Sequence, residues 1–218
     1  MSYKAIIAGS TGLIGSHLLN ILLNNDEYTH VVSLVRKNTG IAHHKLREVV
    51  VDFDKLDEYE QVIAGHALFC CLGSTQKKTP DLKVYYKIDH DYPLQLAQLA
   101  FKNGVEQYHL ISSMGANSGA SNFYLKTKGE AEEDIIQTGV NCLHIYRPAF
   151  LTGDRKEYRF AEKILTPFMA IINPLLIGGM KKYRSIPAQT VAMAMYNESL
   201  KNNEGVFIHP SDNIKQLA

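Results

Sequence analysis

Short apolar segments alternate with longer segments of helical spacing along the first two thirds of the chain. The apolar runs, each too short for a helix and most containing Val, Ile, Phe or Tyr, lie at residues 5–8, 31–35, 49–53, 67–72, 108–111 and 142–146. Apolar residues recur at helical intervals over 13–23, 56–63, 84–101 and 123–136. Strands that alternate with helices form parallel βαβ units with right-handed crossovers. We therefore predict an α/β fold: a doubly wound parallel sheet with helices on both faces.

The length of 218 residues fits one domain, and no linker rich in Gly, Ser or Pro divides the chain. The alternation weakens after Arg147, where prolines occur at positions 148, 167, 174, 187 and 210. In an open α/β sheet, substrates bind beyond the carboxyl ends of the strands. We expect residues 1–218 to form a single domain in which 148–218 supply a small substrate-capping region.

Charge and cysteine content exclude several classes of partner and compartment. The net charge is +1, and no block of like charge occurs, which argues against nucleic acid or an anionic membrane as a partner. Three cysteines in apolar stretches favour a reducing cytoplasm over secretion. The strand-like start leaves no room for a signal peptide, and Pro167 and Pro174 interrupt the longest uncharged stretch, residues 164–180. We expect a cytoplasmic protein without stable membrane insertion.

Three glycines follow the first apolar run at intervals of three, in GSTGLIG. Gly9 would permit a tight turn, Gly12 a close approach of backbone to a pyrophosphate, and Gly15 close packing of helix on strand. The helix that follows offers free N–H groups and the positive end of its dipole to phosphates. The alternative is a glycine-rich turn without a ligand. Because the motif lies between a strand and a helix, we predict a dinucleotide site.

Other candidate cofactor contacts follow later strands. Arg36 and Lys37 end the second strand, where an NAD site usually has an acidic residue; a guanidinium there can bind a 2′-phosphate, so NADP(H) is favoured over NAD. Arg36 could instead be a solvated surface charge. Asp52 and Phe53 come at the end of the third strand, and Leu72 and Gly73 follow the fourth. Asp52 taken alone is also typical of a solvated turn.

A tyrosine and a lysine four residues apart, in YLKTK, are the candidate reacting groups. Tyr124 and Lys128 lie on one face of the predicted helix. An ammonium beside a phenol favours the phenolate, so Tyr124 would be the acid/base and Lys128 its electrostatic support and a ligand of the nicotinamide ribose. Ser112 and Ser113 end the preceding strand and could place a hydroxyl near the substrate. An exposed helix face and a strand-terminal serine turn are the alternatives.

Together these residues resemble the short-chain dehydrogenase/reductases, in particular their atypical, extended-like NADP-binding members. The resemblance is closest to the Tat-interacting oxidoreductase-like proteins, through VDFDKLDEY, FCCLGST, DHDYPLQLA, SNFYLKTKGE and YRP within residues 3–155. It implies a Rossmann core that binds NADP(H), with Leu72 and Gly73 behind the ribose, Leu151 by the nicotinamide and Arg159 also touching the cofactor. The implied adenosine and phosphate contacts are Arg36 and the turn residues Ser10, Thr11, Gly12, Leu13 and Ile14.

The resemblance favours an NADP(H)-dependent oxidoreductase, or an epimerase/dehydratase-like enzyme, acting on a small carbonyl, hydroxyl or sugar-like compound. Asp89 departs from the pattern, because many relatives carry an asparagine there that holds a proton-relay water. The rival hypothesis is a non-catalytic NADPH-binding redox sensor or interaction protein, with a homodimer or a regulatory partner. The 9 histidines show no HExxH or zinc-like spacing, so we expect no metal and interpret His109 and His144 as structural.

Overall fold

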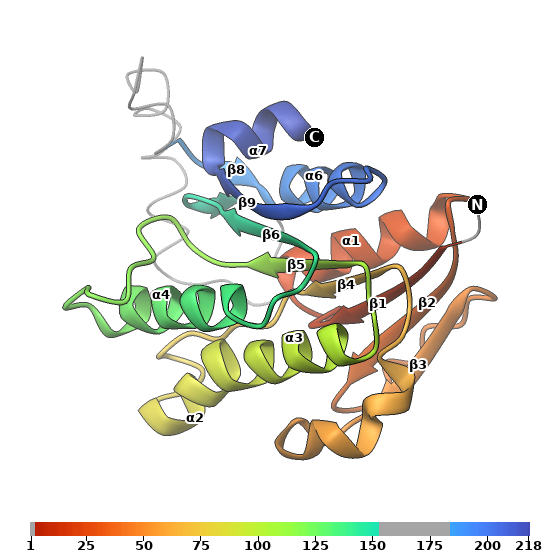
Figure 1. The fold of residues 1–218 in the computed structure, drawn as a ribbon, viewed down its shortest axis with the longest axis horizontal. Helices are drawn as coiled ribbons and strands as arrows, with labels where there is room; N and C mark the ends of the chain where they lie inside the picture. Colours follow the sequence, from red (N-terminus) through yellow and green to blue (C-terminus); the bar gives the residue numbers. More distant parts are fainter. Residues whose placement is uncertain (1–2, 153–183) are drawn as a thin grey trace.

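A seven-stranded parallel sheet forms the centre of the computed structural model, which describes residues 3–152 and 184–218 (Figure 1). The strand order is β3-β2-β1-β4-β5-β6-β9. The strands are β1 Tyr3–Ala8, β2 Tyr28–Val35, β3 Leu46–Val50, β4 Ala67–Cys70, β5 Gln107–Ile111, β6 Cys142–Arg147 and β9 Gly205–Pro210. The first six follow the order of dinucleotide-binding sheets, which reverses between β1 and β4. The predicted fold class is confirmed.

Helices cover both faces of the sheet (Figure 1). On one face lie α1 (Leu13–Asn24), α6 (Ala188–Ser199) and the short α7 (Ser211–Leu217). On the other lie α3 (Tyr92–Lys102), α4 (Phe123–Ile136) and the 3₁₀ segment η1 (Phe53–Val62). The short α2 (Leu82–Tyr86) and the π-helical turn η2 (Lys87–Asp91) lead into α3.

The two faces bury separate apolar cores, as a sheet covered on both sides requires. Ile7 of β1 packs with Leu18 of α1 and Met195 of α6 on one face. The neighbouring residue Ile6 points to the opposite face, into the core that contains Leu96 of α3. This alternation follows from the two-residue period of a strand. The near-continuous apolar runs of the sequence therefore correspond to strands buried on both sides.

Two of the predicted helices differ in the structure. The segment predicted at 56–63 is a 3₁₀ segment from Phe53 to Val62, and Lys55 inside it has non-helical torsion angles. The long helix predicted at 84–101 is interrupted by η2. Pro93 has no N–H to donate to the carbonyl of Asp89, four residues earlier, and Tyr92 donates to the Lys87 carbonyl across a wider turn. The proline thus accounts for the change of helix type.

The C-terminal third contributes to the sheet as well as to the region beyond it. β9 extends the sheet beside β6, and α6 packs against α1. Apolar side chains of residues 186–218 thus complete the core under α1. The substrate-capping role of 148–218 stays a prediction. The short strands β7 (Leu151–Thr152) and β8 (Ile186–Pro187) pair in a separate two-stranded sheet. Residues 153–183 lie outside the described residues.

Candidate nucleotide and catalytic site

Two of the three motif glycines are required by the protein backbone itself. Gly9 has a φ of +85°, in the left-handed region, and a Cβ there would lie 2.5 Å from the carbonyl oxygen of Cys71. A Cβ at Gly15 would collide with the backbone of Gly9. The first glycine therefore makes the turn out of β1, and the third brings α1 close to the strand, as their spacing predicts.

Gly12 differs, because the surrounding protein leaves more room beside it. A Cβ there would lie 3.2 Å from the Gly9 oxygen and 3.9 Å from the Cys71 oxygen. Gly12 is also the N-cap residue of α1, and among the described residues no side chain caps this helix and no acidic residue occupies its first turn. The first N–H groups of α1 and its positive dipole end thus face outward. This arrangement fits the pyrophosphate of a dinucleotide.

The other residues of the turn hold it in place. Ser10 is buried, and its hydroxyl accepts a hydrogen bond of 2.7 Å from Ser33 of β2. The Ile14 side chain lies in the core under α1, so only its backbone can face a ligand. Leu13 is half-buried and Thr11 is exposed. Within the motif, Thr11 is therefore the side chain with the most freedom to contact a cofactor.

The predicted adenosine side of the site lies at the ends of β2 and β3. Leu34 of β2 is in register with Ala8 of β1, so Arg36 and Lys37 leave the sheet at the edge where the glycine turn begins, and both are exposed. Asp52 is exposed and caps η1 by accepting a 3.0 Å bond from the Asp54 N–H.

Phe53 faces the protein interior at the same end of β3. Its buried ring packs against Tyr92, with 5.5 Å between the ring centroids. Phe53 therefore supports the turn, and its backbone and the Asp52 side chain remain as the parts that could reach a cofactor.

The end of β4 brings the glycine turn close to the predicted reacting groups. The Cys71 N–H donates to the Ala8 carbonyl, which continues the β1–β4 pairing by one residue. Leu72 is half-buried and Gly73 is exposed. A Cβ at Gly73 would lie 3.5 Å from Asp89 Oδ1 and 3.7 Å from Lys128 Nζ. The loop after β4 therefore joins the nucleotide end of the sheet to the N-terminal part of α4.

Lys128 forms a buried ion pair that sequence reasoning missed. Its Nζ lies 2.9 Å from Asp89 Oδ1 and donates to the Ile111 carbonyl at 3.4 Å. Burial lowers the pKa of Lys128, but the nearby Asp89 and Tyr124 outweigh burial and raise it above its usual range. The ammonium is therefore charged at neutral pH. The available signal was Asp89 itself, a carboxylate at a position where many relatives carry an amide.

Asp89 holds three elements together around this pair. Its Oδ2 accepts a 2.8 Å hydrogen bond from the Ser74 N–H in the loop after β4. Asp89 belongs to η2, and Lys128 lies in the second turn of α4. Tyr124, one turn earlier on α4, is half-buried. The carboxylate thus positions the lysine and the loop that borders the predicted nicotinamide side.

The two serines after β5 have different environments. The Ser112 hydroxyl donates to the buried Glu132 carboxylate, which also accepts from Arg147 Nε at 3.0 Å. This network joins α4 to β5 and β6. Ser113 is half-buried, and within residues 3–152 and 184–218 its hydroxyl makes only a long 3.4 Å contact with the Met114 carbonyl. Of the two predicted serines, Ser113 has the hydroxyl that is more available to a substrate.

The last two predicted cofactor contacts lie beyond β6. Leu151 is half-buried in β7, in register with Ile186. Arg159 lies outside the described residues, as does the apolar stretch at 164–180.

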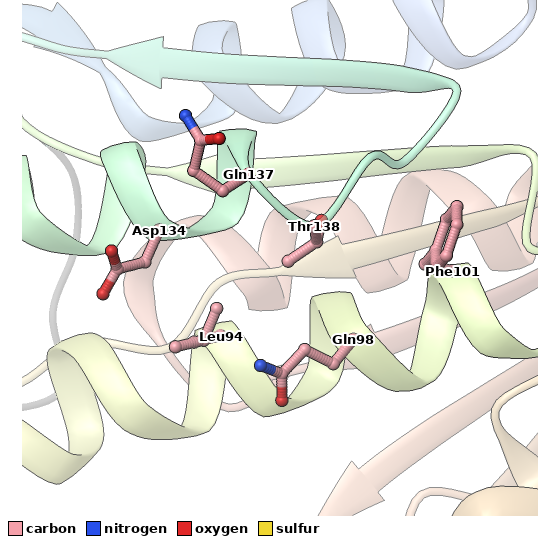
Figure 2. A pocket seen from close by; sticks show the side chains of 6 residues that line it. All are labelled: Leu94, Gln98, Phe101, Asp134, Gln137 and Thr138. Atoms are coloured by element: carbon pink, nitrogen blue, oxygen red, sulfur yellow. The ribbon is translucent and has the colours of Figure 1, made fainter.

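A surface cavity of about 310 Å³ lies elsewhere, between α3 and α4 (Figure 2). It is lined by Leu94, Gln98, Phe101, Asp134, Gln137 and Thr138. None of these is a predicted site residue. Within the described ranges, no helix has the length and hydrophobicity to span a bilayer.

Comparison with known families decides the assignment. Residues 9–171 match the model of a family described as NAD(P)H-binding, and the matched region starts at the first motif glycine. The chain belongs to this NAD(P)H-binding family. It is 32% identical to Protein HTATIP2 of Rattus norvegicus over 210 residues, which cover 94% of this chain and 85% of the relative. The resemblance to the Tat-interacting proteins is thereby confirmed.

A second relative and two solved structures extend the comparison. Protein fmp52, mitochondrial, of Aspergillus fumigatus is 31% identical over 212 residues, which cover 94% of this chain and 90% of the relative. A UDP-N-acetylglucosamine 4-epimerase from Methanobrevibacter ruminantium has a TM-score of 0.72 at 17% identity, covering 96% of this chain and 76% of the other. The Bordetella bronchiseptica enzyme WbmH, in complex with NAD+, has a TM-score of 0.73 at 18% sequence identity, and the match covers 97% of this chain and 76% of that enzyme. These two share the fold of the NAD(P)H-binding chain.

Proposed function

We propose that this chain is an NADP(H)-dependent oxidoreductase, or an epimerase/dehydratase-like enzyme, that acts on a small carbonyl, hydroxyl or sugar-like compound. The observation that carries the proposal is the position of Gly73. It lies in the loop after β4, the strand next to β1, and a Cβ built on it would lie 3.7 Å from Lys128 Nζ. The open helix terminus and the Tyr124/Lys128 pair therefore serve one site.

The preference for NADP(H) over NAD rests on Arg36. This exposed guanidinium ends the strand beside the glycine turn, where a dinucleotide-binding sheet places the adenosine ribose. A guanidinium can make paired, charge-assisted hydrogen bonds to a phosphate. Lys37 adds a second positive charge at the same edge.

The reacting groups would work as an acid/base pair. When bound, NADP(H) supplies or accepts the hydride. Tyr124 donates or accepts the substrate proton, and the Lys128 ammonium favours the phenolate by its charge. The Ser113 hydroxyl orients the substrate oxygen. Ser112 acts through the Glu132 network, which fixes the position of α4 relative to β5.

Replacing Tyr124 by Phe tests this assignment. NADPH consumption is followed with a panel of aldehydes, ketones and nucleotide-sugars, and any substrate found is then offered to Tyr124→Phe. The ring still packs, so NADPH affinity stays nearly unchanged, while loss of the proton donor lowers turnover by about 10² to 10⁴. Full turnover by the variant would exclude Tyr124 as the proton donor.

A second candidate function is supported by the Asp89–Lys128 pair. Because the carboxylate neutralises the ammonium at 2.9 Å, the lysine supports Tyr124 less than a free ammonium would. Such a site suits a protein that binds NADPH and changes its partners, as a homodimer or with a regulatory protein. Tight NADPH binding without turnover across the whole panel would favour this alternative. The cytoplasmic location stays a prediction, and a fungal relative carries the word mitochondrial in its name.

A further inference from the structure

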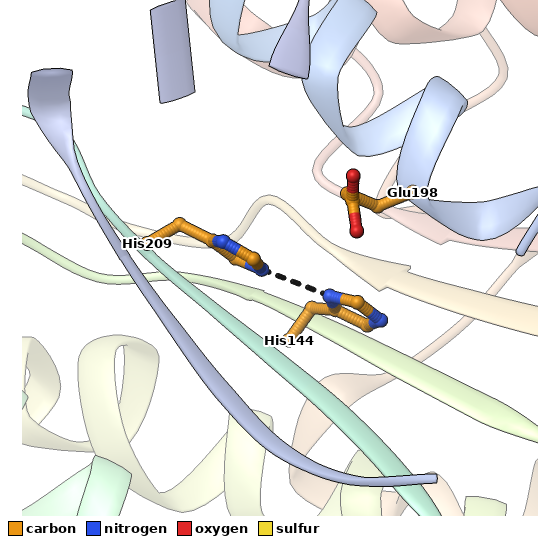
Figure 3. Close-up of side chains that lie close together, drawn as sticks. All are labelled: His144, Glu198 and His209. Carbon is orange, nitrogen blue, oxygen red and sulfur yellow. Dashed lines mark hydrogen bonds between the residues drawn. The ribbon is translucent and has the colours of Figure 1, made fainter. Parts of the chain in front are cut away.

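Three side chains from distant parts of the sequence meet in a buried cluster away from the nucleotide site (Figure 3). His144 lies on β6, His209 on β9 and Glu198 in the last turn of α6. Their exposed fractions are 0%, 6% and 4%. One nitrogen or oxygen atom from each lies within 4.8 Å of the other two. We propose that His144, His209 and Glu198 form a binding site for a divalent transition-metal ion of the Zn²⁺ class.

The donor set has the chemistry that such an ion requires. Two imidazoles and one carboxylate are an established ligand set for Zn²⁺, with the fourth position left for water. The His144 ring is fully buried and stacks on His209, with 5.2 Å between the ring centroids, so both imidazoles are held in place. Soft and borderline ions are preferred over Mg²⁺ or Ca²⁺, because those select oxygen ligands.

Hydrogen bonds already orient the two rings for a shared ligand. Asn213 Oδ1 lies 2.8 Å from His209 Nδ1, so with this amide orientation Nδ1 carries the proton and Nε2 is free to bind. His209 Nε2 and His144 Nδ1 face each other at 2.9 Å, as Figure 3 shows. One proton is shared between them. A metal ion that enters there moves this proton to His144 Nε2, which lies 3.2 Å from Cys142 Sγ and can donate to it, and Asn213 becomes the outer partner that metal-bound histidines usually have.

The Glu198 carboxylate provides the negative charge of the proposed metal site. Glu198 is buried, and its Oε1 accepts a 2.5 Å bond from Lys201 Nζ, whose side chain is half-exposed. Lys201 can therefore turn to solvent when a cation takes its place. Ligand atoms around four-coordinate Zn²⁺ lie about 3.3 Å apart, so the imidazoles separate slightly and the Glu198 side chain moves toward them.

A metal ion at this position would join β6, β9 and α6, which hold the C-terminal third on the sheet. Its binding energy would add to the stability of the fold, because the unfolded chain cannot preassemble ligands from positions 144, 198 and 209. The same separation explains why the sequence shows no metal motif. The site does not depend on the proposed function, since no predicted cofactor or catalytic residue belongs to it.

Metal titration of the chelator-treated full chain tests the proposal. Co²⁺ and Zn²⁺ are added in competition with a chromophoric chelator, and thermal unfolding is recorded. We expect one equivalent to bind, a visible Co²⁺ spectrum of tetrahedral type, and a higher Tm. Glu198→Gln and His209→Gln should each lose the spectrum and the rise in Tm. The matched control is His43→Ala/His44→Ala, which removes a stacked pair outside the cluster, His43 half-buried and His44 exposed, and should retain both.

Asn213 supplies a test that leaves all three ligands in place. Asn213→Ala should lower metal affinity by about 10- to 100-fold, whereas Asn213→Asp should retain it, because a carboxylate also accepts the Nδ1 proton. The proposal would be overturned if the wild type showed no saturable metal binding, or if His43→Ala/His44→Ala abolished that binding. Equal metal affinity in Asn213→Ala and the wild type would also overturn it. The cluster would then be a hydrogen-bonded histidine pair only.

Discussion

Helices α1 and α4 both begin at the carboxyl edge of the sheet, yet their first turns differ. α4 is capped by Asn122, whose side chain accepts a 3.1 Å bond from the Leu125 N–H. α1 begins at Gly12 without a side-chain cap among the described residues. At a capped helix N-terminus, a side chain accepts a hydrogen bond from one of the free backbone N–H groups. At an uncapped N-terminus, these N–H groups remain available to a ligand. In the proposed function, α1 would therefore bind the cofactor through its backbone, and α4 would act through the side chains of its first two turns.

The glycines of the two helices show the same difference. A Cβ at Gly129 of α4 would collide with the backbone of Asn117 and Ser118, so this glycine is needed for packing. A Cβ at Gly12 meets no protein atom closer than 3.2 Å. The protein alone thus requires Gly129 far more strictly than Gly12. The proposed approach of a pyrophosphate would account for a glycine at this position.

The largest effect should come from Gly12→Val. The added side chain would occupy the space of the pyrophosphate, so NADPH binding is lost while the circular dichroism spectrum stays near native. Gly129→Val is the control, and it should lower the free energy of unfolding because the loop at 117–118 must move. If Gly12→Val bound NADPH with wild-type affinity, the glycine motif would be only a structural turn.

A smaller effect, on the pH dependence of turnover, is expected from Asp89→Asn. This change removes the negative charge opposite Lys128 but keeps the shape of the side chain. The pKa of Lys128 then falls, because a carboxylate no longer favours its charged form. We therefore expect the limb of the pH–rate profile that depends on charged Lys128 to move to lower pH.

The pH–rate profile of the wild type is the control. An unchanged profile in Asp89→Asn would mean that Asp89 serves only to hold the Ser74 loop.

The smallest effect should come from the cap of α4. Asn122→Ala removes one side-chain acceptor, which costs about 1 kcal/mol of unfolding free energy, measured by urea denaturation. NADPH affinity should remain nearly unchanged, because the cofactor binds the uncapped helix α1. A large loss of affinity in Asn122→Ala would contradict the separation of roles between the two helices.

Local patterns in the sequence were sufficient for the fold and for the glycine turn. The apolar runs and helical segments alternate up to residue 147, apart from the adjacent runs at 31–35 and 49–53, and Gly9 and Gly15 of the motif have a local steric reason. β9 was not predicted, because Val206 and Ile208 at this sheet edge remain exposed and the strand contains His209 and Pro210. Strand patterns are clearest where both faces are buried.

Contacts between distant residues explain what the sequence could not predict. Asp89 and Lys128 come from η2 and α4, and only the folded chain brings them to 2.9 Å. The cluster of His144, Glu198 and His209 has no sequence spacing to reveal it. Ser112 and Ser113 are neighbours in sequence, yet only the structure shows that Glu132 binds the first hydroxyl.

In the proposed function, the turn at β1 and Arg36 at the end of β2 together bind NADP(H). The most direct measurement is the dissociation constant of NADPH and of NADH for the wild type and for Arg36→Ala, by calorimetric titration at one salt concentration. The wild type should bind NADPH more tightly, and Arg36→Ala should lose about 1.5–3 kcal/mol for NADPH and much less for NADH. Equal dissociation constants for the two cofactors in the wild type would contradict the account.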